Sequence, residues 1–467
     1  MIQTSGVDTR RRALAVCLAA AFMSGLDVSI VNVALPSIRA GLHAGADGLQ
    51  WTLSGYALTF GLLLVPAGRI GDARSRRTVF VWGVALFTAA SAACGMAPTM
   101  GVLVVSRLLQ GLAAGLVIPQ VSGLIQQMFQ GRERGRAFGA LGATIGLSTA
   151  AGPLIGGALV TAFGPAQGWR WVFLVNVPIG IALLPLARRF LPAQQQEAGR
   201  RESVDPVGVL LLGVGVAALL LPFIQQHQWP GNAKWLLVPA AFAVLGGFVL
   251  WERSYRREPV VDLALFRKRS YSLGSAIALF YFAGFTGIFF IFTLYLQSGE
   301  GYSPLLAGLS ITPFALGSAV ASVAGGRLVW RAGRRLVAVG LAAVIAGLAA
   351  TIGATTLVPG HGVGAATALP LLVAGIGSGL VISPNQAITL SEVPPAGGGS
   401  AGGVLQTGQR LGSAIGIAAA GSVFFGSFGG GWAHAFRHGL LVVIGFVLAA
   451  LIAAAYDLLR SRADPPA

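Results

Sequence analysis

Apolar residues occupy long stretches of this chain, and short polar segments separate one stretch from the next. Each stretch is long enough to cross about 30 Å of hydrocarbon as a helix, at about 1.5 Å per residue. We expect helices throughout, because lipid offers no hydrogen-bond partner to an open strand edge. The pattern therefore predicts an all-α membrane protein with fourteen transmembrane helices, at residues 13–35, 50–68, 78–97, 101–125, 137–162, 170–190, 206–225, 235–252, 271–297, 304–328, 335–358, 366–391, 400–426 and 438–459.

Composition supports the membrane and argues against nucleic acid as a partner. The mean hydropathy is +0.76 and charged residues make up 10% of the chain, too few to cover a soluble protein of 467 residues. The net charge of +17 is unevenly placed: with a cytoplasmic N-terminus, 26 of the 32 basic residues fall on the cytoplasmic side. This asymmetry predicts that both termini are cytoplasmic. The basic loops are then expected to contact lipid of that leaflet, whereas a nucleic-acid reader concentrates charge on one folded face.

An internal repeat predicts two related halves. Residues 68–77 return as residues 326–335, and residues 111–118 match residues 375–382. An even number of inserted helices keeps both basic loops on one side of the membrane, as in a parallel repeat. The predicted domains are an N-terminal six-helix bundle at 1–190, a linker with two extra helices at 191–270, and a C-terminal six-helix bundle at 271–467.

The two inserted helices carry almost no polar side chains, so we expect them to face lipid. Polar segments at 191–205 and 253–270 bracket them, and the first reads as a flexible cytoplasmic loop. We therefore do not expect the side chains of these two helices to line a polar pathway.

Several chemistries are excluded by what the chain lacks. Its two lysines, Lys234 and Lys268, do not follow a Gly-x-x-x-x-Gly run that would cradle phosphate. No group of His, Cys and carboxylate residues has metal-ligand spacing. Cys17 and Cys94 fall inside predicted helices and indicate no disulfide framework. We therefore expect no ATP-driven pump, no enzyme, no cofactor and no metal.

Asp27 is the one acidic residue that falls well inside a predicted span. A carboxylate there is costly unless it faces the bundle interior, and such residues usually belong to ion or substrate pathways. Burial favours the neutral form of a carboxyl group, so Asp27 is a candidate to carry a proton or to hold a cationic substrate. The alternative is a structural residue bonded to Ser24 or Asn32. Arg107, the other intramembrane charge of this half, either tunes Asp27 or snorkels to the interface.

A second candidate function is gating, at the end of the span that contains Gly68. Asp72 there can accept hydrogen bonds from the start of the helix predicted at 400–426, where Ser400 is a suitable N-cap and free N–H groups favour a carboxylate. Such a contact would lock the two halves in an outward-open state, while Arg76 and Arg77 face lipid phosphates or a partner acid. The alternative is that this loop is only a topology signal.

The span at 137–162 contains glycines at Gly-x-x-x-Gly spacing, which allows close helix contact, and a proline that can kink the helix. These features fit either a gating role or ordinary tight packing. The residues concerned are Gly146, Gly152, Pro153, Gly156 and Gly157.

Five segments together resemble the major facilitator superfamily, and within it the fourteen-span drug/proton antiporter family. The likeness covers essentially the whole chain and implies a fold of two six-helix bundles plus two inserted helices. It also implies that Arg107 takes part in proton transfer and that the glycine-rich span seals a leak route. The segments are Leu26 to Pro36, Gly68 to Arg77, Arg107 to Gly111, Gly146 to Gly157, and Trp169 to Pro178.

The chain departs from this family pattern in its gating loop. A basic residue usually follows the Asp, where this chain has Ala73, and a glycine usually stands where this chain has Ser75. The second copy of the loop has Trp330 in place of Asp72. The gate is therefore expected to be asymmetric, and no ionic partner for Arg76 is evident.

The expected function is proton-coupled export of lipophilic, possibly cationic, drugs or antibiotics across a bacterial inner membrane by a monomer. Aromatic residues and few charges suit such solutes. An uptake or facilitative carrier for a small metabolite, and a non-transporting receptor, remain alternatives because fold does not fix function. Residues expected to line the substrate cavity are Asn32, Trp51, Tyr56, Gln120, Thr144, Tyr281, Phe285, Tyr295, Asn385 and Gln406.

Overall fold

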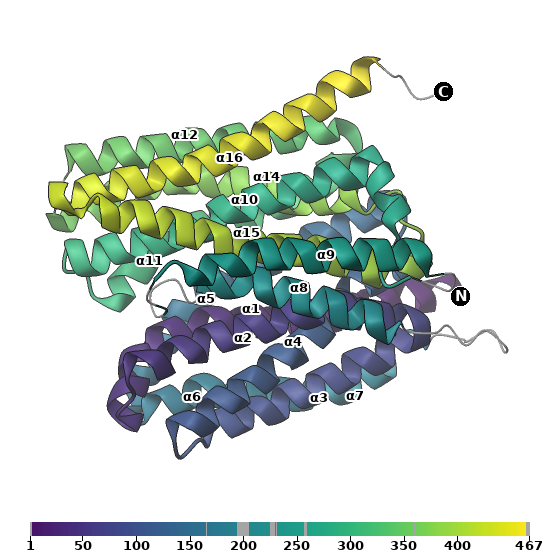
Figure 1. Ribbon diagram of the computed structural model, residues 1–467, viewed down its shortest axis with the longest axis horizontal. Helices are drawn as coiled ribbons and strands as arrows, with labels where there is room; N and C mark the ends of the chain where they lie inside the picture. The colour runs from purple at the N-terminus through teal and green to yellow at the C-terminus, as the bar shows by residue number, and fades with distance from the viewer. Residues whose placement is uncertain are drawn as a thin grey trace. The chain divides into compact units, whose positions relative to one another are not determined.

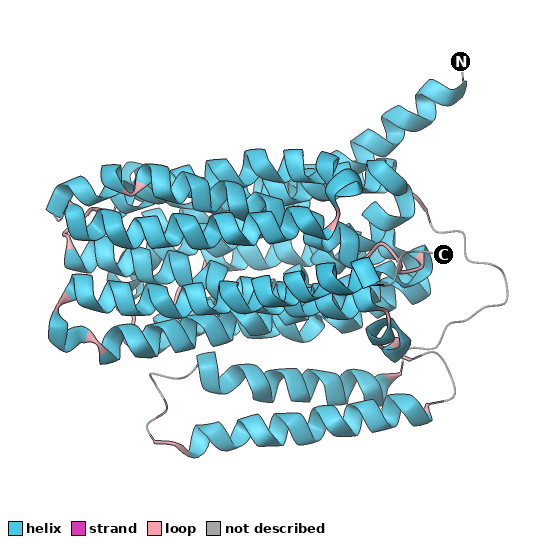
Figure 2. Ribbon diagram, turned by 90° about the horizontal axis from the view of Figure 1, so that it is seen from above, coloured by secondary structure: helices cyan, strands magenta, loops and turns pink. Residues whose placement is uncertain are grey.

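The computed structural model describes residues 2–164, 166–193, 205–224, 229, 231–255, 259–358 and 360–463. These residues form helices and short connections, with no strand among them (Figure 2). They divide into two compact units. Unit 1 comprises Met1–Phe129, Ile155–Leu263 and Val393–Thr407, and unit 2 comprises Gln130–Leu154, Ala264–Glu392 and Gly408–Ala467.

Figure 1 labels the α-helices of the chain except the four-residue α13. Those that lie wholly in unit 1 are α1 (Ile2–Leu42), α2 (Ala46–Ile70), α3 (Arg76–Gly95), α4 (Met100–Met128), α6 (Gly168–Leu174), α7 (Asn176–Phe190), α8 (Pro206–Ile224) and α9 (Leu237–Ser254). Those that lie wholly in unit 2 are α10 (Arg269–Leu294), α11 (Pro304–Ala332), α12 (Arg334–Leu357), α13 (Val363–Ala366), α14 (Ala368–Thr389) and α16 (Trp432–Ala463).

Two helices are shared between the units. Helix α5 (Gly131–Phe163) passes from unit 2 to unit 1 after Leu154, directly beyond Pro153. Helix α15 (Gly398–Gly426) passes from unit 1 to unit 2 after Thr407. Unit 2 therefore contains the first part of α5, and unit 1 contains the first part of α15.

Within the described residues, twelve helical segments are long and apolar enough to cross a membrane. One of them, Asp47–Gly95, spans 49 residues, about 74 Å at 1.5 Å per residue, and contains both α2 and α3. The segment breaks at Ser75, whose backbone is extended (φ −164°) and whose hydroxyl accepts from the N–H of Thr78 to cap α3. The chain is thus a multi-pass helical membrane protein, which confirms the all-α part of the expected fold class, while the described residues give twelve such segments where fourteen helices were expected.

The two copies of the repeated loop, residues 68–77 and 326–335, turn in different ways. Ser75, where the family pattern has a glycine, uses an extended backbone and a side-chain cap after a π-helical segment, Gly71–Ser75. The corresponding residue of the second copy is Gly333, with φ +51°, a conformation that glycine adopts without steric cost. Serine therefore replaces glycine here because the first copy does not use a left-handed turn.

The repeat is visible in the helix packing of each unit. In unit 1, Gly111 of α4 approaches α2 so closely that a Cβ there would lie 2.4 Å from the carbonyl oxygen of Tyr56. In unit 2, the matching Gly375 of α14 approaches α11, and a Cβ would lie 2.1 Å from the carbonyl oxygen of Phe314. Small residues permit this backbone approach, so the repeated glycines preserve one helix contact in both units.

Helices α8 and α9 pack on each other, and α8 also packs on α2. Val65 of α2 joins Phe248, Val260 and Val261 in a small buried cluster at one end of the pair. Half of the residues of α9 are exposed, and Ala241, Phe248 and Glu252 are buried. Of the two polar segments predicted to bracket the pair, residues 194–204 and 256–258 lie outside the described residues.

Candidate functional site

The first charge cluster of unit 1 is centred on Asp27 of α1, which is fully buried. Arg107 Nη1 of α4 donates to Asp27 Oδ2 over 2.6 Å. Gln110 Nε2 and Asn176 Nδ2 donate to Asp27 Oδ1 over 2.8 and 3.0 Å. Three donors from α4 and the start of α7 thus hold one carboxylate, as buried charge requires.

Arg107 is held as tightly as its partner. It is 1% exposed, and its Nε donates to the carbonyl oxygen of Thr52 over 2.9 Å while Nη1 also donates to Gln110 Oε1 over 2.7 Å. The guanidinium lies 4.2 Å from the ring centre of Tyr56, a cation–π contact. Arg107 therefore does not snorkel, and its partner is the acid that the sequence indicated.

Ser24 and Asn32, the neighbours expected if Asp27 had a purely structural role, bond other groups. Ser24 contacts the hydroxyl of Tyr56 at 3.4 Å, and Asn32 is exposed and donates to the carbonyl oxygen of Val28. Sequence reasoning missed the roles of Gln110 and Asn176, although both fall inside segments that carried the family resemblance. The available signal was a polar side chain at each position within a largely apolar segment.

The second charge cluster of unit 1 is built on Asp72, in the π-helical segment after α2. Its Oδ2 accepts from the N–H and the hydroxyl of Ser400 over 2.7 and 2.8 Å, and its Oδ1 accepts from the N–H of Gly399 over 3.0 Å. The contact expected at the start of α15 is therefore present. A carboxylate meets free N–H groups and the positive end of the helix dipole there.

Of the two expected alternatives for Arg76, lipid phosphates or a partner acid, the structure has the partner acid. It is 3% exposed, and its Nε and Nη2 donate to Asp72 Oδ1 over 2.8 and 2.6 Å. It also donates to the carbonyl oxygens of Gly123 and Ala396 over 3.2 and 2.9 Å. The missing ionic partner of Arg76 is thus Asp72 itself, one helical turn earlier. Arg77 is half-buried, and it donates to the carbonyl oxygen of Arg188.

Glycines make the Asp72 contact possible. A Cβ on Gly68 would lie 2.3 Å from the carbonyl oxygen of Gly399, and a Cβ on Gly403 would lie 2.5 Å from that of Leu64. Real Cβ atoms do not approach so closely, so any larger residue at these positions would push α2 and α15 apart. Gly68 therefore lets the backbones meet at the distance that Asp72 spans.

The second copy of the loop, in unit 2, replaces this cluster with a different one. Arg334 stands where Arg76 stands in the first copy, and its Nε donates to Asp457 Oδ2 of α16 over 2.7 Å. Arg269 reaches the other oxygen of Asp457 at 2.8 Å. Asn385, expected to line the substrate cavity, accepts from Arg334 Nη1 over 2.5 Å. The buried arginine is retained, but its acid comes from another helix because Trp330 occupies the place of Asp72.

The residues expected to gate within α5 lie at close helix contacts. In unit 2, a Cβ on Gly146 would lie 3.1 Å from the carbonyl oxygen of Ala315, and Pro153 packs against Gly308. In unit 1, a Cβ on Gly156 would lie 2.9 Å from the side chain of Ile30. Gly152 is buried and Gly157 is half-buried.

The expected substrate residues fall into two groups. Three of them are not fully buried: Asn32 is exposed, and Trp51 and Thr144 are half-buried. The others are buried within one unit: Tyr56, Gln120, Tyr281, Phe285, Tyr295, Asn385 and Gln406. Several of these side chains bond neighbouring helices, as do Gln120 to the carbonyl oxygen of Ala67 and Gln406 to Ser122.

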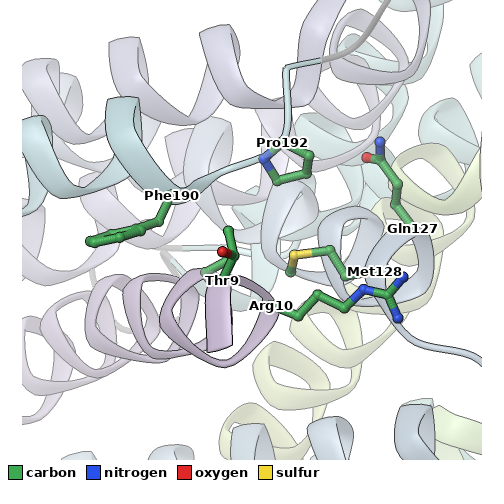
Figure 3. A pocket seen from close by; sticks show the side chains of 7 residues that line it. Thr9, Arg10, Gln127, Met128, Phe190 and Pro192 are labelled. Atoms are coloured by element: carbon green, nitrogen blue, oxygen red, sulfur yellow. The ribbon is translucent and has the colours of Figure 1, made fainter. Parts of the chain in front are cut away.

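A pocket of about 270 Å³ lies in unit 1, and one of its lining residues, Gln127, accepts from Arg76 Nη1 of the Asp72 cluster over 3.3 Å. It is formed at the start of α1, the end of α4 and the end of α7 (Figure 3). None of the expected substrate residues lines it. Its lining residues are Thr9, Arg10, Ala13, Gln127, Met128, Phe190 and Pro192.

Buried, fully bonded charge within membrane-spanning helices usually marks a pathway for ions or solutes. The fold and the charge clusters together define a multi-pass membrane transporter. The chain belongs to the Major Facilitator Superfamily, whose family model matches residues 17–417. This membership places it among transporters rather than enzymes.

The curated relatives include transporters for antibiotics and other drugs. The chain is 38% identical to the probable actinorhodin transporter of Streptomyces coelicolor over 90% of this chain and 73% of that protein. It is 35% identical to the multidrug resistance protein Stp of Mycobacterium tuberculosis, over 86% of this chain and 73% of that one. It is 34% identical to the tetracenomycin C resistance and export protein of Streptomyces glaucescens, over 85% and 73%.

Solved structures agree on the fold. A human organic anion transporter matches 95% of this chain and 99% of its own, with a TM-score of 0.70 and 17% identity. A proton:xylose symporter matches 97% and 96%, with a TM-score of 0.66 and 16% identity. At such low identity these likenesses concern architecture alone.

Proposed function

We propose that this protein is a proton-coupled exporter of lipophilic, often cationic, drugs or antibiotics that works by alternating access. The observation that carries the proposal is the buried Asp27–Arg107 pair. The printed names of the relatives, which include multidrug resistance and antibiotic export proteins, support drugs as the substrate class. The scarcity of charge in the predicted substrate set is consistent with this class.

The proton step follows from the charge of the cluster. With Asp27 ionised, its negative charge balances Arg107 inside a dry environment. Protonation of Asp27 would leave the guanidinium as an uncompensated buried cation, which is strongly unfavourable. Proton binding therefore favours a rearrangement that separates the two groups or hydrates Arg107. Such a rearrangement is what couples a proton to a change of conformation.

The Asp72 cluster is proposed to act as the gate. It ties the end of α2 to the start of α15 through the Asp72 carboxylate, and to α4 through the bond from Arg76 to the carbonyl oxygen of Gly123. Opening the cytoplasmic side would require these bonds to break, and Gly68 sets how closely the helices can return. In α5, Gly146, Gly152, Pro153, Gly156 and Gly157 are proposed to seal the path by close packing.

We further propose fourteen transmembrane helices. Separating α2 from α3 and adding α15 to the twelve apolar segments gives that number. The proposed membrane is the bacterial inner membrane, with both termini cytoplasmic, because the basic residues gather in alternate loops. In this proposal residues 1–190 and 271–467 are the repeated bundles, 191–270 is the inserted linker, and the protein works as a monomer surrounded by lipid.

The test is ethidium transport in everted membrane vesicles with an imposed pH gradient. Wild-type vesicles should accumulate ethidium while the gradient lasts and lose it when an uncoupler is added. Asp27→Asn should abolish gradient-driven accumulation, whereas Asp8→Asn, which changes an exposed acid on the same helix, should leave it unchanged. Gradient-driven accumulation by Asp27→Asn at the wild-type rate would refute proton coupling through Asp27. Ethidium movement without a gradient would favour a facilitative carrier instead.

A further inference from the structure

A pair of carboxyl groups lies at one end of the inserted helices, away from both charge clusters. Asp205 directly precedes α8, and Glu252 lies in the last turn of α9; they are 1% and 5% exposed. A Cβ on Gly208 would lie 2.5 Å from Asp205 Oδ2 and 3.0 Å from Glu252 Oε1. The two carboxyl groups therefore lie together beside Gly208, in the first turn of α8.

Their hydrogen bonds are unequal. Asp205 Oδ1 accepts from the N–H of Val207 over 3.0 Å, and its Oδ2 accepts from Trp251 Nε1 over 2.7 Å. Glu252 Oε1 accepts from the N–H of Val260 over 3.1 Å, but Glu252 Oε2 is buried and has no hydrogen-bond partner. A bare, buried oxygen on an ionised carboxylate beside a second carboxylate is unfavourable. The bonds of Asp205 suit the charged form, whereas Glu252 Oε2 lacks the donor that an oxygen of an ionised carboxylate needs.

We propose that Glu252 and Asp205 form a second proton-binding site, separate from Asp27, in which Glu252 carries the proton on Oε2 and Asp205 stays ionised. Among the described residues, two charged groups act on Glu252: Asp205 opposes its ionisation and Arg69 of α2 favours it. Loss of the proton would place a second negative charge in the same buried space. This site does not depend on the transport function proposed above.

The structural consequence concerns the contact of Phe248, Val260 and Val261 with Val65 of α2. The loop that bonds Glu252 is also the loop whose Val260 and Val261 pack with Phe248 against Val65 of α2. An ionised Glu252 would draw water to this end of the pair and loosen that contact. The contact is therefore expected to be firm with the proton bound and weaker at alkaline pH.

The first measurement detects the proton itself. Infrared difference spectra of the full chain in nanodiscs are recorded while the pH is raised. A carboxylic-acid C=O band should disappear with rising pH in the wild type and in Asp27→Asn, and this band should be missing from Glu252→Gln. In Asp205→Asn the band should disappear at lower pH than in the wild type, because the neighbouring negative charge is gone.

The second measurement follows the helix contact by amide hydrogen exchange of residues 237–255 and 259–263, corrected for intrinsic exchange at each pH. Protection should fall at alkaline pH in the wild type and persist in Glu252→Gln, which mimics the protonated form. Identical spectra and identical exchange in the wild type and Glu252→Gln would overturn the proposal. If Glu252→Gln does not fold, the Asp205→Asn spectra decide. The proposal is overturned if the carboxylic-acid band disappears at the same pH as in the wild type, and supported if it disappears at lower pH.

Discussion

Replacing Asp72 by alanine is the most direct perturbation of the proposed gate. The change removes the acceptor for two bonds from Arg76, for the N–H groups of Gly399 and Ser400, and for the Ser400 hydroxyl. Arg76 would be left buried without its acid. Removing one partner of a buried ion pair costs about 3–5 kcal/mol. The contact between α2 and the start of α15 should weaken by that amount.

This free energy predicts a large change in hydrogen exchange. At 1.4 kcal/mol per tenfold change, 3–5 kcal/mol corresponds to roughly 10²- to 10³-fold. Amides that exchange when the contact opens should become faster by this factor, provided that opening and closing are rapid. The amides of Gly399 and Ser400 report on it directly, because they donate to Asp72. Exchange is measured by mass spectrometry on peptides that cover residues 395–403.

Two variants separate this explanation from a general loss of stability. Arg74→Ala changes an exposed arginine in the same loop and should leave exchange of the 395–403 peptides unchanged. The double variant Asp72→Ala/Arg76→Met removes both charges, so it should exchange more slowly than Asp72→Ala alone. Wild-type exchange in Asp72→Ala, or a double variant faster than Asp72→Ala, would show that the carboxylate does not hold the contact.

Two further predictions concern packing and buried charge. Gly111→Ala should lower the free energy of unfolding in detergent by about 1–3 kcal/mol, because the added methyl group overpacks against α2. Gly101 lies on the same helix beside open space, so Gly101→Ala should not be destabilising. Equal midpoints for the two variants in a denaturant titration would contradict this prediction. Asp457→Asn should lower the free energy of unfolding by about 3–5 kcal/mol, because it leaves Arg334 buried without its acid. The control Asp8→Asn, at an exposed acid, should lower it by about 0–1 kcal/mol. A loss for Asp457→Asn no larger than that for Asp8→Asn would show that the ion pair of unit 2 does not stabilise the fold.

The sequence was most informative where a charged side chain in an apolar surrounding had few possible partners. Asp27 and Arg107 are the intramembrane charges of the first half, so each was the natural partner of the other, and they do pair. Asp72 needed donors, and the start of a helix supplies them at Gly399 and Ser400. In both cases an unpaired charge in an apolar surrounding would be strongly unfavourable, so few arrangements of partners were possible.

Sequence reasoning was weaker where many residues could serve. Gln120 and Gln406 are polar groups inside apolar helices, and such groups can face a cavity or bond the next helix; the structure has them bonding helices. Arg334 lacked an acid in its own loop, and its partner Asp457 comes from near the end of the last helix, which no local pattern connects to it. Glu252 stood at a predicted helix end, where burial could not be read from sequence.

The Asp27–Arg107 pair also has a consequence for how the chain is made. The two residues are 80 positions apart, so at 5–20 residues per second the ribosome needs about 4–16 s to supply the arginine after the aspartate. During that interval the first helix carries an acid whose insertion costs about 2.5–3.5 kcal/mol. A nascent chain that ends before its fourth helix therefore lacks the counter-ion for its most costly residue, and prolonged retention of that helix at the translocon follows from the order of synthesis.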